Sequence, residues 1–356
     1  MALSRIGARK TYPLIDIMKF VFAILIVAIH IPPLKDFSDF GNYMIAQCLS
    51  RIGVPFFFMA ASYFLFRKMD IGKLDLGRIK RYVIRIFLML TAWTMIYLPL
   101  ILWGAIHSEK GIIWGIGARI YKFILGGDAQ FHLWFLQALI VAVAIVVLLI
   151  KRKWSFGKMI AFALILHTIA LLGGSYHFVY LHFFPEGSAI YEFFHANAKF
   201  MPNTVNGATE GFLYVALGAM LALKGHSYSR RQIYIGCAVF WLLFIMEAAS
   251  IKIMFPYSKG STAYVFLIPA AVFTFLLGKY VSLANKPVYM IMRKMSMYVY
   301  LIHPWFIAIV ALVSKKVFPI DSLTQYVLVV VLSLISARLL VCLSYRSNNR
   351  FLSMLG

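Results

Sequence analysis

Three ionisable residues interrupt the first apolar stretch of this chain, between Leu14 and Leu34: Asp16, Lys19 and His30. An ionised group held at membrane depth costs about 2.5–3.5 kcal/mol even on insertion scales, so such groups usually serve a function. At about 100° per residue, Lys19 and His30 lie within about 20° of each other around a helix axis, and Asp16 lies about 40° away. We therefore expect all three to face a protein interior or a water-filled cavity.

His30 has the chemistry of a general base. An imidazole titrates near neutral pH and takes a proton from a hydroxyl group during acyl transfer. The alternative is a structural histidine that hydrogen-bonds a neighbouring helix. Asp16 and Lys19 are candidate catalytic residues beside it; alternatively, they pair with each other, which would allow both charges to be buried.

Two arginines, Arg78 and Arg81, form a second candidate site. They belong to the segment from Arg67 to Arg85, which holds seven Lys or Arg residues. At the start of a helix, a spacing of three lets both guanidinium groups face one phosphate-bearing ligand. The other interpretation is a topology signal that also contacts anionic lipid.

Other polar residues in apolar surroundings are candidates for substrate binding or for structural roles. Arg51 precedes a predicted break at Gly53-Val54-Pro55, so it either lines a cavity or snorkels to the outer interface. Glu210 and Glu247 could each be an acid, a base or the partner of a cation, and the sequence does not choose. The remaining candidates are His132, Trp134, Asn206 and His303, and the aromatic belt of a membrane protein also accounts for most of the aromatic–histidine segments.

The composition is that of a polytopic membrane protein. Of 356 residues, 62% are hydrophobic and 13% are charged, and no soluble domain is left over. The net charge of +23 is spread between apolar runs instead of forming one basic face, so we expect a bilayer and no nucleic acid as partner. Cys48, Cys237 and Cys342 lack the spacing of a disulfide framework or a metal site, and we predict neither.

Ten apolar runs near the ~20 residues needed to cross a bilayer predict an all-α transmembrane helix bundle. They begin at about Leu14, Asn42, Arg85, Phe131, Lys158, Gly207, Gln232, Thr262, Ser296 and Leu323. An even number places both termini on one side. Basic residues favour the loops on that side by 23 to nine, which predicts that both termini are cytoplasmic. We expect one membrane domain over residues 1–356, since no repeat or linker divides the chain.

Six short motifs, in order, give the chain a family resemblance over nearly its whole length. They are Leu14–Lys19 with His30, Arg51–Met59, Arg78–Arg81, His132–Phe135, Asn206-Gly207 and Tyr300–Pro304. In these motifs the chain resembles the acyltransferase 3 family of integral membrane acyltransferases. It departs at Lys19, where arginine is commoner, at Ala61-Ser62, where Ser-Gly is usual, and at Val205, where arginine is usual.

The resemblance implies transfer of an acyl group, commonly acetyl from cytoplasmic acetyl-CoA, to a hydroxyl or amine of an envelope saccharide, glycan or exopolysaccharide. Arg78 and Arg81 would hold the CoA phosphates, and His30 would deprotonate the acceptor. Lys19 or Arg51 would offset developing negative charge. We expect acetyl-CoA as a substrate with no permanently bound cofactor, and the bacterial cytoplasmic membrane as the location.

Two other functions stay open. Membrane domains of this family that are fused to racemases look like importing modules, and buried charges also suit a transporter of a small polar solute. A non-catalytic component of polysaccharide export is the other alternative. We expect neither the hydrolase-like domain nor the racemase domain that some members carry.

Overall fold

The computed structural model describes residues 11–108, 111–125, 132–200, 204–255 and 263–346. This part of the chain is helical and contains no β-strand. The helices are α1 (Pro13–His30), α2 (Asp39–Tyr43), α3 (Gly53–Phe66), α4 (Leu76–Ile96), α5 (Leu98–Ile106), α6 (Ile112–Leu125), α7 (Trp134–Lys151), α8 (Phe156–Leu172), α9 (His177–Phe183), α10 (Ala189–Phe200), α11 (Phe212–Leu223), α12 (Arg230–Met254), α13 (Leu267–Tyr280), α14 (Pro287–Lys316) and α15 (Ser322–Arg346). Three shorter turns are η1 (Met44–Cys48), η2 (Leu49–Ile52) and η3 (Gly207–Gly211).

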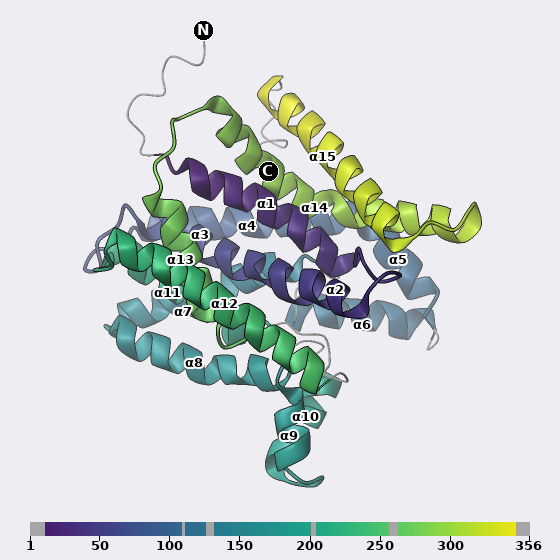
Figure 1. Cartoon of the computed structure of the whole chain (residues 1–356), viewed down its shortest axis with the longest axis horizontal. Helices are drawn as coiled ribbons and strands as arrows, with labels where there is room; N and C mark the ends of the chain where they lie inside the picture. The colour runs from purple at the N-terminus through teal and green to yellow at the C-terminus, as the bar shows by residue number, and fades with distance from the viewer. Residues whose placement is uncertain (1–10, 109–110, 126–131, 201–203, 256–262, 347–356) are drawn as a thin grey trace.

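The long helices form one bundle, with α8 towards one side and α15 on the other (Figure 1). Within the described ranges, six helical segments are long and apolar enough to cross a membrane, or eight if each of two bent pairs is one span. The chain is therefore a multi-pass membrane protein. The six are α1, the run Asp39–Phe66, α7, α12, α14 and the run Ser322–Tyr345.

The other predicted spans also correspond to helices. The third and fifth are the bent pairs α4 with α5 and α8 with α9, and the sixth and eighth are the shorter apolar helices Gly207–Leu223 and Leu267–Tyr280. Two predicted starting points, Phe131 and Thr262, lie outside the described residues. The count of ten, and the side of each terminus, therefore stay predictions.

Local sequence explains where several helices begin and bend. The side chains of Asp75, Ser155 and Ser229 accept hydrogen bonds from the first turns of α4, α8 and α12, as capping residues do. Pro99 lies at the start of α5, next to a 54° bend from α4. A proline has no N–H to continue the hydrogen bonds of the preceding helix, so the bend falls there.

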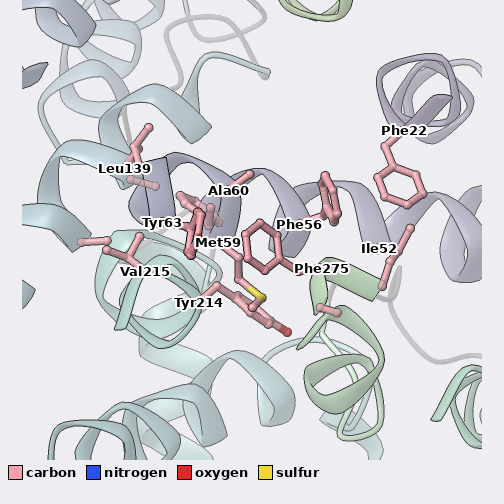
Figure 2. Packing of buried hydrophobic residues seen from close by; sticks show 14 of the residues in the cluster. Phe22, Ile52, Phe56, Met59, Ala60, Tyr63, Leu139, Tyr214, Val215 and Phe275 are labelled. Carbon is pink, nitrogen blue, oxygen red and sulfur yellow. The ribbon is translucent and has the colours of Figure 1, made fainter. Parts of the chain in front are cut away.

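The centre of the bundle is the contact between α3 and α11. Figure 2 shows Phe56, Met59 and Tyr63 of α3 packed against Tyr214 and Val215 of α11, in the apolar cluster that also holds residues of α7 and α13. The hydroxyl of Ser62 donates to the carbonyl oxygen of Val215 at 2.6 Å. These contacts fix one face of α3 and leave other residues of the helix to line a cavity.

Gly218 permits this close approach. A Cβ atom added there would lie 2.5 Å from the carbonyl oxygen of Met59, so Gly218→Ala must push α3 and α11 apart. We expect destabilisation by about 1–3 kcal/mol, seen as a lower melting temperature in detergent. Gly157→Ala is the matched control, because a Cβ there would come no closer than 3.9 Å to Ser155. Equal melting temperatures for the two variants would contradict the close contact between α3 and α11 at Gly218.

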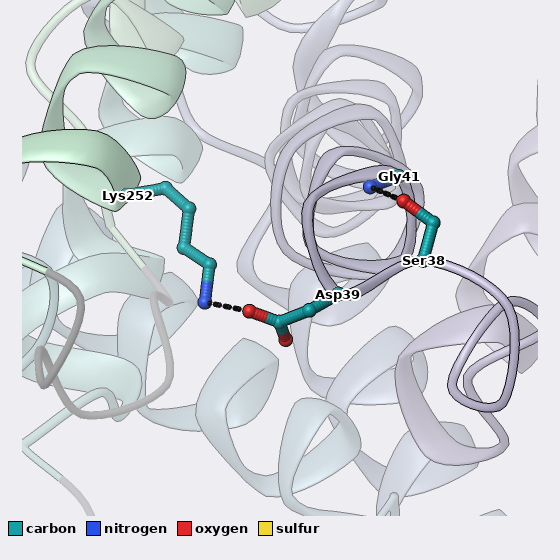
Figure 3. A network of polar contacts seen from close by, with 4 residues as sticks. All are labelled: Ser38, Asp39, Gly41 and Lys252. Atoms are coloured by element: carbon teal, nitrogen blue, oxygen red, sulfur yellow. Dashed lines mark hydrogen bonds and ion pairs between the residues drawn. The ribbon is translucent and has the colours of Figure 1, made fainter.

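A surface ion pair joins the segment that follows α1 to the end of α12. The ammonium group of Lys252, near the end of α12, lies 2.6 Å from a carboxylate oxygen of Asp39 at the start of α2 (Figure 3). Ser38 caps the same short helix by accepting a hydrogen bond from the backbone N–H of Gly41 at 3.0 Å. The chain is thereby held where it passes from α1 towards α3.

Candidate functional site

A cavity of about 620 Å³ lies between α1, α3, α4, α7 and α14. It brings together six of the residues that the sequence predicted: Lys19, His30, Arg51, Arg78, His132 and Trp134. Phe57, Phe64, Phe135 and Met89 contribute apolar walls. A mostly apolar cavity with a few polar groups is typical of a small-molecule site, and the volume falls in the usual range.

A second cavity, of about 640 Å³, adjoins the first. The first turn of α1, the end of α3 and the starts of α4 and α14 line it. Its lining includes one acidic residue, Asp16, and five basic ones: Arg67, Lys68, Arg78, Lys286 and Arg293. Three residues, Phe64, Arg78 and Arg293, line both cavities. We call the second the basic cavity and the first the histidine cavity.

Asp16 and Lys19 have different surroundings. The carboxylate of Asp16 is 3.8 Å from the guanidinium group of Arg293, whereas the ammonium group of Lys19 lies 5.0 Å from the centre of the Phe64 ring. The structure contains no Asp16–Lys19 ion pair, although both residues are described. Asp16 and Lys19 still lie in each other's electrostatic field, but the cation within ion-pair distance of Asp16 is Arg293 of α14, which packs against α1.

Arg78 and Arg81 also have different surroundings. The guanidinium group of Arg78 donates to the carbonyl oxygen of Phe64 at 3.1 Å and lines both cavities. Arg81 is exposed and lines neither, so phosphate binding by Arg81 stays a prediction without support from the geometry.

Sequence reasoning missed Arg85, which lines the histidine cavity with Arg78 and Tyr82. At 100° per residue, Arg85 lies about 20° from Arg78 around the axis of α4, and Arg81 lies about 60° from Arg78 in the same direction. The seven-residue spacing from Arg78 to Arg85 was the signal that identifies the cavity face.

Three imidazoles meet at the end of α1. The rings of His30 and His303 stack with centroids 5.3 Å apart and an angle of 27°, and the ring of His132 lies edge-on to His303 at 5.5 Å. His30 and His132 line the histidine cavity, whereas His303 is fully buried and lines neither cavity. His303 therefore lies behind the cavity wall.

Tyrosine hydroxyls and a proline hold this group together. Tyr300 donates to the carbonyl oxygen of His132 at 2.6 Å, which joins α14 to the start of α7. Tyr97 donates to the carbonyl oxygen of Leu301 at 2.7 Å. Pro304 lies inside α14 and has no N–H, so the carbonyl oxygen of Tyr300, four residues earlier, receives no helical hydrogen bond.

Arg51, in η2, lines the site, whereas Glu210, in η3, lines neither cavity. Arg51 lines the histidine cavity and donates two hydrogen bonds to the side-chain oxygen of Gln47. Glu210 is 2% exposed, lies in η3, and experiences the positive charge of Arg51, but the two form no ion pair within 4.0 Å. Glu247 instead accepts hydrogen bonds from Tyr176 and from the backbone at Val265 and Phe266, a structural role.

Asn206 caps the turn that carries Glu210. Its side-chain oxygen accepts from the backbone N–H groups of Ala208 and Thr209, and the Thr209 hydroxyl accepts from the Asn206 backbone N–H. We expect Asn206→Ala to destabilise the protein by about 0.5–2 kcal/mol in thermal melts. Asn206→Asp is the control, because its carboxylate accepts the same bonds. An equal loss in both variants would exclude capping as the reason.

Comparison with known proteins shows the family of this chain. A family model described as an acyltransferase domain matches residues 12–342. The chain belongs to the acyltransferase 3 family. The predicted resemblance is thus confirmed, and the two cavities are those of an acyltransferase 3 domain. No solved structure was found to match this member.

Relatives of this acyltransferase 3 protein carry other names. Two Enterococcus faecalis proteins named amino-acid racemase are 28% and 29% identical over 262 and 341 residues, which are 73% and 92% of this chain. An Enterococcus gallinarum protein named serine/alanine racemase is 25% identical over 324 residues, 90% of this chain. These alignments cover 35%, 45% and 44% of the respective relatives, so the chain spans less than half their length.

Proposed function

We propose that this protein transfers an acetyl group from acetyl-CoA to a hydroxyl of an envelope saccharide, glycan or exopolysaccharide at the bacterial cytoplasmic membrane. The observation that carries the proposal is the pair of adjoining cavities, one rich in cations and the other ending at His30. A donor with several phosphates and a long arm that ends in a thioester has the matching chemistry.

The basic cavity would hold the phosphates of the donor. Arginine binds phosphate oxygens in bidentate fashion, and the five cations there outnumber the single carboxylate of Asp16. Because Arg78 and Arg293 line both cavities, they lie where the phosphate end of CoA would give way to its pantetheine arm. Lys19 would lie along the path of that arm.

His30 would act at the other end. Its imidazole takes the proton of the acceptor hydroxyl as the oxygen bonds to the thioester carbon; the carbon–sulfur bond then breaks, and the proton passes to the departing sulfur. Lys19 lies about 16 Å from His30 along α1, at 1.5 Å per residue. Arg51, whose charge acts on His30, is therefore the better cation to stabilise the tetrahedral oxyanion.

Import of a small amino acid is the second candidate. The names of the relatives favour it, because three of them are called racemases of amino acids, serine or alanine. A cavity lined by charges suits a translocation path as well as an acyl donor.

One experiment separates these two functions. Proteoliposomes receive acetyl-CoA labelled in the acetyl group, with a bacterial envelope glycan fraction as acceptor, and uptake of labelled L-serine is measured in parallel. We expect release of CoA thiol together with label on the glycan, both dependent on the protein. Saturable serine uptake without binding of acetyl-CoA or transfer of its label would favour transport.

A further inference from the structure

We infer that His303 is a positioning residue for His30: its ring stacks on the His30 imidazole and fixes the plane in which that imidazole removes the acceptor proton. This inference rests on the proposed acyl transfer for its catalytic consequence. It begins from a residue that touches neither cavity, so His303 does not contact substrate. Its effect must therefore pass through a neighbour.

The hydrogen bond of His303 shows which of its ring nitrogens carries a hydrogen. Nδ1 lies 3.1 Å from the carbonyl oxygen of Val299, and a carbonyl oxygen only accepts, so Nδ1 carries the hydrogen. Nε2 of the neutral ring is then a lone-pair acceptor, and among the described residues this buried atom has no hydrogen-bond partner. A proton on Nε2 would be a buried N–H without an acceptor among these residues, so the His303 ring beside His30 is neutral.

The stacking geometry supplies the physical effect. With centroids 5.3 Å apart and planes inclined by 27°, the rings of His30 and His303 form an offset stack. Aromatic rings with centroids about 4.5–7 Å apart attract each other in this arrangement. The contact holds the His30 imidazole, which lines the histidine cavity, in one plane.

The surrounding turn is built to hold His303 in place. Tyr97 bonds the carbonyl of Leu301, and the Tyr97 ring stacks on Trp305 at 5.7 Å. Tyr300 bonds the backbone of His132. These contacts flank His303 on both sides, so its ring has little freedom to follow a displaced His30.

His167 provides a matched control. It is also fully buried, its Nδ1 lies 3.0 Å from the carbonyl oxygen of Thr209, and its Nε2 likewise has no partner among the described residues. It lines neither cavity. His303 and His167 thus share burial and hydrogen bonding, and differ in the contact with His30.

The kinetic test compares His303→Ala, His303→Phe and His167→Ala in the acetyl-transfer assay. We expect His303→Ala to lower kcat about 30-fold with KM for acetyl-CoA within two-fold. This is a smaller loss than the roughly 10²- to 10⁴-fold that a general base itself contributes, because the base His30 remains. His303→Phe keeps a ring face and should recover at least five-fold over alanine, while His167→Ala stays within two-fold of the parent. A kcat for His303→Ala within three-fold of the parent, or no recovery with phenylalanine, would overturn the inference.

A second measurement does not depend on acyl transfer. Diethyl pyrocarbonate modifies neutral imidazoles, and mass spectrometry of the peptide that contains His30 gives its rate of modification. Loss of the stacked ring should raise that rate at least three-fold in His303→Ala but not in His167→Ala. An unchanged rate would refute the positioning role, whereas a changed rate in a protein without acetyl transfer would refute only the proposed function.

Discussion

Replacement of His30 by alanine is expected to lower the rate of acetyl transfer by about 10²- to 10⁴-fold, the range that a general base contributes. His30 lines the histidine cavity, stacks on His303 and lies in the electrostatic field of Arg51. The remaining groups of the cavity would still bind the donor. The affinity for acetyl-CoA should therefore change less than three-fold, so the loss should appear in kcat.

Two controls make the result specific. His167→Ala removes a buried histidine outside both cavities and should leave kcat within two-fold. Binding of acetyl-CoA to the His30→Ala protein, measured in detergent, shows whether the variant is folded. A variant that binds acetyl-CoA and transfers acetyl at the parental rate would exclude His30 as the base.

Arg78→Ala is expected to weaken binding of acetyl-CoA by about 10- to 100-fold. A hydrogen bond to a charged group contributes about 1.5–3 kcal/mol, and each 1.4 kcal/mol is a factor of ten in affinity. Arg78 is the arginine of its segment that lines both cavities. Affinity for acetyl-pantetheine, which lacks the phosphates, should change less than three-fold in the same equilibrium binding assay.

Arg81→Ala is the matched control for this prediction. It removes the same charge from the same turn of α4, but Arg81 is exposed and lines neither cavity. We expect its affinity for acetyl-CoA to stay within two-fold of the parent. A loss of acetyl-CoA affinity at Arg81 comparable to the loss at Arg78 would restore the paired phosphate site predicted from the spacing alone. Equal losses for acetyl-CoA and acetyl-pantetheine at Arg78 would argue against phosphate binding.

Helical periodicity predicted part of the site well. A face shared by Lys19 and His30 follows from the geometry of one helix, and both residues line the histidine cavity. The same reasoning did not give the partner of Asp16, because Arg293 comes from a helix far along the chain. Periodicity within a helix says which residues face inward, and tertiary packing decides what they meet.

Other features depend on contacts that no local pattern contains. The stacking of His30 on His303 joins α1 to the proline-interrupted turn of α14. The capping role of Asn206 could have been predicted from sequence, since asparagine is among the residues favoured at helix N-caps. Glu210 was recognised as a candidate, but neither its burial nor its closeness to Arg51 could be read from spacing.

The number of membrane spans was harder to predict, for a different reason. Apolar runs near Gly207 and Thr262 predicted helices that span the membrane. Within the described part, the structure has shorter apolar helices there: Gly207–Leu223, of 17 residues, and Leu267–Tyr280, of 14 residues. Composition shows that a segment is apolar, whereas the length of its helix depends on where a capping residue such as Asn206 starts it. The presence of a helix could therefore be predicted more reliably than whether that helix is long enough to cross a bilayer.

The most direct measurement of the central claim is vectorial acetyl transfer in oriented proteoliposomes. Acetyl-CoA labelled in the acetyl group is supplied only on the side of the Arg67–Arg85 segment, and an envelope glycan fraction is enclosed on the opposite side. The account predicts labelled glycan inside and one CoA thiol released outside for each acetyl group transferred. No thiol release and no labelled glycan, in protein that is folded and correctly oriented, would contradict it.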